Sequence, residues 1–147
     1  MNKVDHNQMV FDLRVFHAKF GKARPKYPSK LDEEAYAFRI KFLQEELDEY
    51  KHAVETGDLA KQFDALLDLV YVAIGTADLQ GFPWEDGWAE VQRANMSKVP
   101  AGSSGDSKRG YSGDIVKPPG FIPPDIEGIL EQAGIDATFG SLEPSPL

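Results

Sequence analysis

Proline and glycine are distributed unevenly along this chain, and their distribution limits where long helices can form. Residues 1–98 contain 3 prolines and 5 glycines, whereas residues 99–147 contain 7 prolines and 8 glycines. Proline removes a helical hydrogen bond and glycine costs backbone entropy, so a dense mixture of both excludes long helices. We therefore predict an all-α fold, with four main helices in a domain of residues 1–98. Residues 99–147 are expected to form an irregular Pro/Gly-rich C-terminal extension, packed on the same domain or on a neighbouring subunit.

Apolar side chains recur at three- and four-residue spacing in four segments, which predicts amphipathic helices. The third of these contains the run LLDLVYVAIGTA at 66–77, which is apolar on nearly all sides. We expect it to be a buried helix rather than a strand, because the helical pattern extends upstream without a break. Within the extension, residues 111–117 are expected to form a short strand, and residues 124–133 a short helix. The four main helices are predicted at Asp5–Phe20, Leu31–Thr56, Leu59–Leu79 and Trp84–Lys98.

The ends of these helices carry recognisable stop and start residues. Gly21 is suited to end the first helix in a left-handed conformation. Ser29 or Asp32 is suited to cap the second helix, because both side chains can accept a hydrogen bond from a free backbone N–H. Gly57 and Asp58 together predict the turn between the second and third helices.

The composition excludes several classes of protein. With 147 residues the chain is expected to form one domain, and with no cysteine it holds neither a disulfide framework nor a thiolate metal site. The net charge of −8 argues against a nucleic-acid partner, which usually meets a basic patch. No apolar run approaches the ~20 residues that a membrane span needs, so no membrane partner is expected. We expect a cytoplasmic protein, located in the host cytoplasm if a phage encodes it.

Two acidic clusters lie on consecutive predicted helices. Within each cluster, residues three or four apart share a helix face, with β-carbons about 5–6 Å apart. The intervening turn is short, so the two helices should pack antiparallel and the clusters can meet across the groove. The clusters are Glu45, Glu46 and Glu49 on the second helix, and Asp64 and Asp68 on the third.

The acidic clusters predict a site for a divalent cation. Residues 45–68 contain eight acidic residues and two lysines. Carboxylates this close raise one another's pKa unless a cation is present, and Mg²⁺ prefers oxygen ligands. A solvated acidic face is the stronger alternative for Glu45 taken singly. It is weaker for Asp64 and Asp68, which border the most apolar stretch, where a carboxylate is costly unless paired or metal-bound. A di-iron bundle is less favoured, because His52 does not supply the usual Glu-x-x-His spacing.

The segments EELDE at 45–49 and DALLD at 64–68 resemble the acidic motifs of the MazG-like all-α nucleoside triphosphate pyrophosphohydrolases. That family's pattern is E-E-x-x-E followed, after a gap, by E-x-x-D. Asp68 matches the family aspartate, but the acidic position three residues earlier is Ala65 here, and Asp64 stands one turn before Asp68. VFHAKFG at 15–21, RANMSKV at 93–99 and VKPPGFIPPDI at 116–126 resemble the phage-type branch of the family. Within that branch the chain is similar to the MazZ group, which converts dGTP to dGMP.

The resemblance implies hydrolysis of a (d)NTP to a (d)NMP and pyrophosphate, with Mg²⁺ or Mn²⁺ as the cofactor and residues 1–98 as the catalytic domain. dGTP or GTP is the leading substrate, and a homodimer or homotetramer is the implied assembly. A chain of charge −8 is expected to hold a triphosphate through bridging cations. Two alternatives stay open: a phosphoribosyl-ATP pyrophosphohydrolase-like enzyme, and a non-catalytic helical protein that binds a nucleotide.

Individual roles follow from position in these motifs. We predict Glu46, Glu49 and Asp68 as the main metal ligands, with Glu45 and Asp64 next. One of Glu45 and Glu46 is expected to act as the base toward the attacking water, and Glu45, Glu46 and Glu49 form the predicted catalytic set.

The remaining candidates are predicted to contact substrate, and each has a structural alternative. Aromatic residues of the first and third helices are suited to stack on base or sugar, although core packing is the stronger reading for both phenylalanines. His17 is suited to bond a nucleobase or, equally, a structural partner. Arg39 is suited to pair with phosphate or with a neighbouring carboxylate, and Lys98 to bind phosphate or to complement a helix dipole. The predicted set is Phe16, His17, Phe20, Arg39, Tyr71, Asn95, Lys98 and Lys117, with Lys108 and Arg109 as further cations of the extension.

Overall fold

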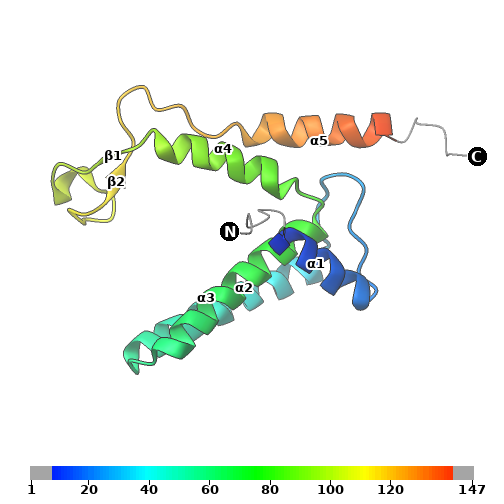
Figure 1. The fold of residues 1–147 in the computed structure, drawn as a ribbon, viewed down its shortest axis with the longest axis horizontal. Helices are drawn as coiled ribbons and strands as arrows, with labels where there is room; N and C mark the ends of the chain where they lie inside the picture. Colours follow the sequence, from blue (N-terminus) through cyan, green and yellow to red (C-terminus); the bar gives the residue numbers. More distant parts are fainter. Residues whose placement is uncertain (1–7, 141–147) are drawn as a thin grey trace, which may run out of the picture. The chain divides into compact units, whose positions relative to one another are not determined.

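A computed structural model of the chain describes residues 8–140, which form five α-helices and a single pair of two-residue strands (Figure 1). The all-α prediction is confirmed, but the extension holds a longer helix than the one expected at 124–133, because residues 126–140 contain no proline. The helices are α1 (Gln8–Lys19), α2 (Glu33–Glu55), α3 (Leu59–Leu79), α4 (Trp84–Met96) and α5 (Ile126–Gly140). The strands are β1 (Val99–Pro100) and β2 (Ile115–Val116), and a short 3₁₀ turn, η1 (Ser104–Asp106), lies between them. Residues 5–7 of the first predicted helix and 141–147 of the predicted extension lie outside the described residues.

The predicted caps and turns are present at the end of α1, at the start of α2 and in the turn between α2 and α3. The Asp32 carboxylate accepts a hydrogen bond from the Ala35 N–H at 2.7 Å, and Asp58 accepts one from the Lys61 N–H at 3.0 Å. Gly21 and Gly57 adopt φ values of +69° and +68°, which side chains on L-residues rarely tolerate. Of the two candidate caps for α2, Asp32 is the one that caps the helix, because its carboxylate accepts the hydrogen bond from Ala35.

The third predicted helix is a helix along its whole length, but its buried residues lie mainly in the C-terminal half, and Ala65 is the buried residue of the N-terminal half. Ile74 packs with Val10 and Leu13 of α1, so α1 covers this half of α3. Towards the N-terminal half, Phe63 is 65% exposed and Leu67 is 53% exposed. The expectation that the whole run 66–77 is buried is therefore wrong for the single chain, because in this unit α1 and α2 do not enclose its first two turns.

Packing divides the described chain into two compact units, residues 8–84 with 130–140, and residues 85–129. In the first unit, α3 packs against both α1 and α2. In the second, β1 and β2 pair antiparallel, with Val99 opposite Val116 and Pro100 opposite Ile115. This division does not test a functional boundary at residue 98, which stays a prediction. Among residues 8–140, no helix combines the length and apolar character that crossing a membrane requires.

Candidate functional site

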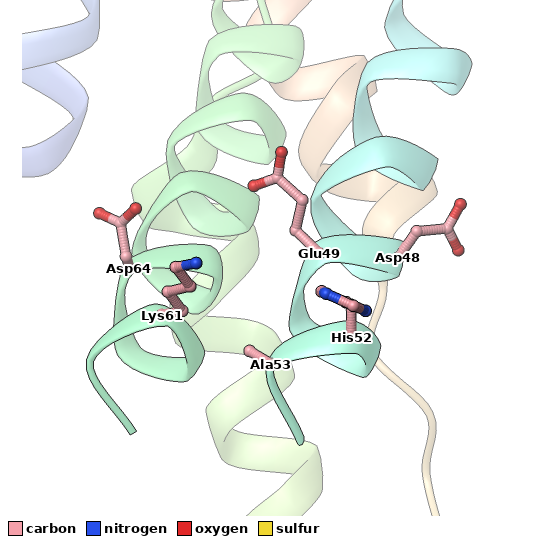
Figure 2. Close-up of a pocket in the computed structure, with 6 residues that line it drawn as sticks. All are labelled: Asp48, Glu49, His52, Ala53, Lys61 and Asp64. Atoms are coloured by element: carbon pink, nitrogen blue, oxygen red, sulfur yellow. The ribbon is translucent and has the colours of Figure 1, made fainter. Parts of the chain in front are cut away.

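An open groove of about 510 Å³ runs between α2 and α3 (Figure 2). Glu49 projects from α2 toward α3, whereas Asp48 projects away from α3. Asp48 also accepts a hydrogen bond from Gln44 at 2.8 Å, so it has a local partner. The lining residues are Asp48, Glu49, His52, Ala53, Lys61 and Asp64. His52 and Lys61 were not predicted as site residues, although His52 stands one turn after Glu49 and marks the same helix face.

Glu46 is the buried member of the acidic motif and lies at its centre. The residue is 8% exposed, and among residues 8–140 its Oε2 atom has no hydrogen-bond partner. Burial raises the pKa of Glu46 above its ordinary value, and the charges of Glu49, Asp68 and Asp64, with a hydrogen bond to Glu49, raise this pKa further. Three carboxylates that the sequence predicts as ligands thus lie near enough to act on Glu46, and we call Glu46, Glu49, Asp64 and Asp68 the acidic cluster. Glu45 is exposed and is not among the groups that act on Glu46.

The acidic cluster has the chemistry that a hard divalent cation requires, which is carboxylate oxygen. In the described part of the chain, Glu46 Oε2 is a buried acceptor without a partner, and the charges that shift its pKa are those of carboxylates. A cation would supply the missing partner and remove the repulsion. Among residues 8–140, no three His, Asp or Glu side chains already converge closely enough to hold a metal ion. Binding would therefore require the exposed Glu49, Asp64 and Asp68 side chains to change rotamer toward Glu46.

A second buried carboxylate, Asp78 of α3, lies in the same helical unit and was not predicted. Its Oδ2 atom lies 2.9 Å from His17 Nδ1. Its Oδ1 atom accepts no hydrogen bond, but the Nε atoms of Arg14 and Arg24 lie 3.5 and 3.4 Å away. The residue is 4% exposed. An acidic residue near the end of the apolar C-terminal half of α3 was the available signal for such a pair.

Two residues predicted to contact substrate are engaged in structural contacts. His17 has Asp78 as its partner, which is the structural alternative stated above. Arg39 donates from Nε to Thr76 Oγ1 at 2.8 Å and from Nη2 to the Val72 carbonyl at 2.8 Å, which joins α2 to α3. Burial lowers the pKa of Arg39. Contacts of either residue with substrate stay predictions.

Glycine is required at position 75 by this packing. A β-carbon there would lie 3.1 Å from Arg39 Nη2 and 3.2 Å from Leu13 Cδ1. Both distances are tighter than ordinary contacts, so α1, α2 and α3 approach one another closely here because residue 75 has no side chain.

The predicted aromatic residues form one cluster on α1 and α3. Phe16 lies 4.9 Å from Phe20 and 5.5 Å from Tyr71 between ring centroids, and the second pair is edge-to-face. All three side chains are substantially exposed. We call Phe16, Phe20 and Tyr71 the aromatic platform; ring faces of this kind are suited to stack on a base. Its contact with a base stays a prediction.

The predicted polar residues of the C-terminal part lie in the unit of residues 85–129. Asn95 is exposed at the end of α4, and its carbonyl accepts a hydrogen bond from the Lys98 N–H at 3.1 Å. Lys98 and Lys117 both lie over the ring of Phe121. Their contacts with phosphate, and that of Asn95 with sugar or phosphate, stay predictions.

A known protein family matches the part of the chain that runs from α1 to α4. The model of the phosphoribosyl-ATP pyrophosphohydrolase family matches residues 13–95, more than half of the chain. No curated protein matches it. The matched range covers all four members of the acidic cluster, as well as Asp78 and the aromatic platform. This chain belongs to the phosphoribosyl-ATP pyrophosphohydrolase family, within the MazG-like all-α NTP pyrophosphohydrolase superfamily.

Proposed function

We propose that this protein is a divalent-cation-dependent nucleoside triphosphate pyrophosphohydrolase that converts a (d)NTP and water to a (d)NMP and pyrophosphate. The observation that carries the proposal is the environment of Glu46, a buried carboxylate surrounded by carboxylates. Such a group is costly unless a cation neutralises it. Membership of a pyrophosphohydrolase family supports the reaction class.

The acidic cluster supplies the residues that would hold Mg²⁺ or Mn²⁺. Either cation, when bound, would neutralise phosphate charge and act as a Lewis acid at the reacting phosphorus. In the proposed reaction, the water oxygen bonds to the α-phosphorus, the bond from that phosphorus to the pyrophosphate oxygen breaks, and a carboxylate takes the proton. Glu46 suits this role better than the exposed Glu45, because Glu46 is the carboxylate on which Glu49, Asp64 and Asp68 act, and a base must lie beside the cation-bound water.

The proposed substrate is a purine deoxynucleotide, with dGTP or GTP leading. The support is the resemblance to the phage-type branch and its MazZ group, together with an exposed aromatic platform that offers faces for stacking. A site that pairs the polar edge of guanine rejects adenine strongly, because its own buried polar groups are then left unpaired. The test is kcat/KM for the four dNTPs and GTP under one metal condition. A preference for dCTP or for dTTP would remove the guanine assignment and leave the chemistry intact.

Phosphoribosyl-ATP is the second candidate substrate, and the family that matches the chain carries its name. Both candidates contain a triphosphate cleaved between the α- and β-phosphates, so the acidic cluster serves either. A non-catalytic nucleotide-binding protein is the third reading, and the intact acidic cluster argues against it.

We propose that the assembly is a homodimer or a homotetramer. The support is the apolar surface that α2 and α3 leave exposed in the single chain, which includes Phe38, Phe63, Leu67 and Val70. Large apolar side chains exposed in this number are commonly covered in an interface between proteins. Light scattering coupled to size exclusion measures the mass directly, and a monomer at micromolar concentration would contradict this proposal.

The test of the reaction combines a substrate panel with labelled water. The protein is incubated with Mg²⁺ and, separately, with dGTP, GTP, the other dNTPs and phosphoribosyl-ATP in H₂¹⁸O. We expect pyrophosphate as the released product and the ¹⁸O label in the monophosphate, because water attacks the α-phosphorus. Release of orthophosphate, or label in the pyrophosphate, would contradict the proposed reaction. Absence of any product with every substrate would favour the non-catalytic reading.

A further inference from the structure

A hollow of about 340 Å³ lies wholly within the unit of residues 85–129, and its charge is opposite to that of the acidic cluster. Four cations and two carboxylates line it, which gives it a net positive charge in a chain whose total is −8. The charged lining residues are Lys98, Asp106, Lys108, Arg109, Asp114 and Lys117. We call this the basic hollow. It lies beyond residue 95, where the family match ends.

Both carboxylates of the basic hollow already have partners. Asp114 accepts hydrogen bonds from Arg109 and from Ser107 Oγ, and these contacts lower the pKa of Asp114 to about 2. Asp106 accepts the Ser103 N–H at 3.0 Å. Asp114 is therefore paired with Arg109, and the remaining charge of the hollow is that of three lysines and one carboxylate, Asp106.

The three lysines form no ion pair within residues 8–140. Two of them flank the paired strands. Val99 pairs with Val116, so Lys98, directly before β1, and Lys117, directly after β2, stand at the same end of the strand pair. Their Nζ atoms lie 6.0 and 5.2 Å from the centroid of one ring, that of Phe121. Two ammonium groups gathered at one end of a hollow repel each other unless an anion joins them.

We propose that the basic hollow binds a polyphosphate anion, with Lys98 and Lys117 as its main contacts. An anion between the two ammonium groups would convert their repulsion into two charge-assisted contacts. The volume lies at the lower end of the range of small-molecule sites, which suits a diphosphate or triphosphate group. That this group belongs to the substrate or to the released pyrophosphate rests on the proposed function.

The test is calorimetric titration of the full chain with pyrophosphate in EDTA, so that no divalent cation can bridge the anion to the acidic cluster. We expect saturable binding that weakens as NaCl is added, because salt screens exposed charges. Lys98→Ala and Lys117→Ala should each weaken binding by about 10-fold, the loss of one charge-assisted contact. Lys117→Arg keeps the charge and should keep binding, which separates loss of the site from loss of the fold.

Lys26→Ala is the matched control. Lys26 also lies over an aromatic ring, that of Tyr27, at 5.9 Å, but it does not line the basic hollow. No binding by the wild type, unchanged binding in Lys98→Ala and Lys117→Ala, or an equal loss in Lys26→Ala would overturn the proposal. Orthophosphate should bind more weakly than pyrophosphate, and equal affinities would contradict a polyphosphate ligand.

Competition identifies the source of the polyphosphate. If dGTP competes with pyrophosphate, the basic hollow holds the triphosphate of a nucleotide, whereas pyrophosphate binding without competition assigns it to the released product. Both results support a polyphosphate site. These titrations contain no divalent cation, so they test the basic hollow separately from the hydrolysis reaction. Loss of pyrophosphate binding would overturn the hollow alone, and absence of hydrolysis would overturn the proposed function alone.

Discussion

Two carboxylates are buried in the helical unit, and they have opposite surroundings. Asp78 faces His17, Arg14 and Arg24, so its negative charge is balanced by side chains of α1 and of the loop that follows it. Glu46 is buried to a similar degree, and the charges that act on it are those of Glu49, Asp64 and Asp68. Asp78, the balanced carboxylate, therefore joins α3 to α1 and to the loop after α1, and its charge requires no ligand. The unbalanced one is costly to the fold as it stands, which is the pattern expected where a site is built for a ligand of opposite charge.

The largest expected effect is on the balanced carboxylate. Asp78→Ala leaves His17 buried without its partner, while Arg14 and Arg24 can still reach water. We expect a loss of about 3 kcal/mol in the free energy of unfolding, measured by urea denaturation. Asp86→Ala, at an exposed position, is the matched control and should change stability by less than about 0.5 kcal/mol. Equal stability of Asp78→Ala and wild type would show that the Asp78 cluster does not hold α1 in place.

The unbalanced carboxylate should behave in the opposite way. Glu46→Gln removes a buried charge among like charges, so without metal at neutral pH the variant should be at least as stable as wild type. The raised pKa of Glu46 means that the folded state favours its protonated form, so its contribution to stability falls as pH rises through that pKa. The same variant should lose activity by about 100-fold or more, since a ligand and candidate base is removed. A destabilised variant with normal turnover would contradict the contrast with Asp78.

Metal binding should also distinguish Glu46 from Asp78. Because the acidic cluster lacks a cation partner, Mg²⁺ or Mn²⁺ at millimolar concentration should raise the melting temperature of the wild type in calorimetry. A ligand at 100 times its Kd stabilises the folded state by about 2.7 kcal/mol, which is large enough to appear as a shift of the melting temperature. Glu46→Gln should show a much smaller shift, and Asp78→Asn a shift close to that of wild type. An equal shift in all three proteins would place the cation elsewhere.

The smallest expected effect concerns Asp114, in the unit of residues 85–129. Like Asp78, it is a carboxylate whose charge is balanced by a neighbouring cation. Because Arg109 and Ser107 lower its pKa to about 2, its contribution to stability is present above the ordinary aspartate pKa and is lost as pH falls from about 4 to 2. A carboxyl NMR titration should place the midpoint for Asp114 near 2 in wild type and closer to 4 in Arg109→Ala. An unchanged midpoint in the variant would remove Arg109 as the cause.

The sequence predicts the helices and the acidic cluster because both depend on local spacing. Glu46 and Glu49 share a face by their spacing on α2, and the turn at Gly57 places them beside Asp64 and Asp68. The partner of Asp78 could not be derived in this way, because His17 lies 61 residues away and meets it only through the packing of α1 on α3. Which of Glu45 and Glu46 is buried depends on the packing of α2 on α3, since adjacent residues on a helix differ by about 100° in direction.

The most direct measurement is the rate of pyrophosphate release from dGTP in Mg²⁺ by four proteins: wild type, Glu49→Gln, Asp68→Asn and Glu55→Gln. The first two variants keep shape and remove one charge from the acidic cluster, whereas Glu55 is an exposed residue at the end of α2 outside it. We predict that Glu49→Gln and Asp68→Asn remain folded and lose most of the turnover, and that Glu55→Gln matches wild type. Rates like those of wild type in folded Glu49→Gln and Asp68→Asn would contradict the assignment of catalysis to the acidic cluster.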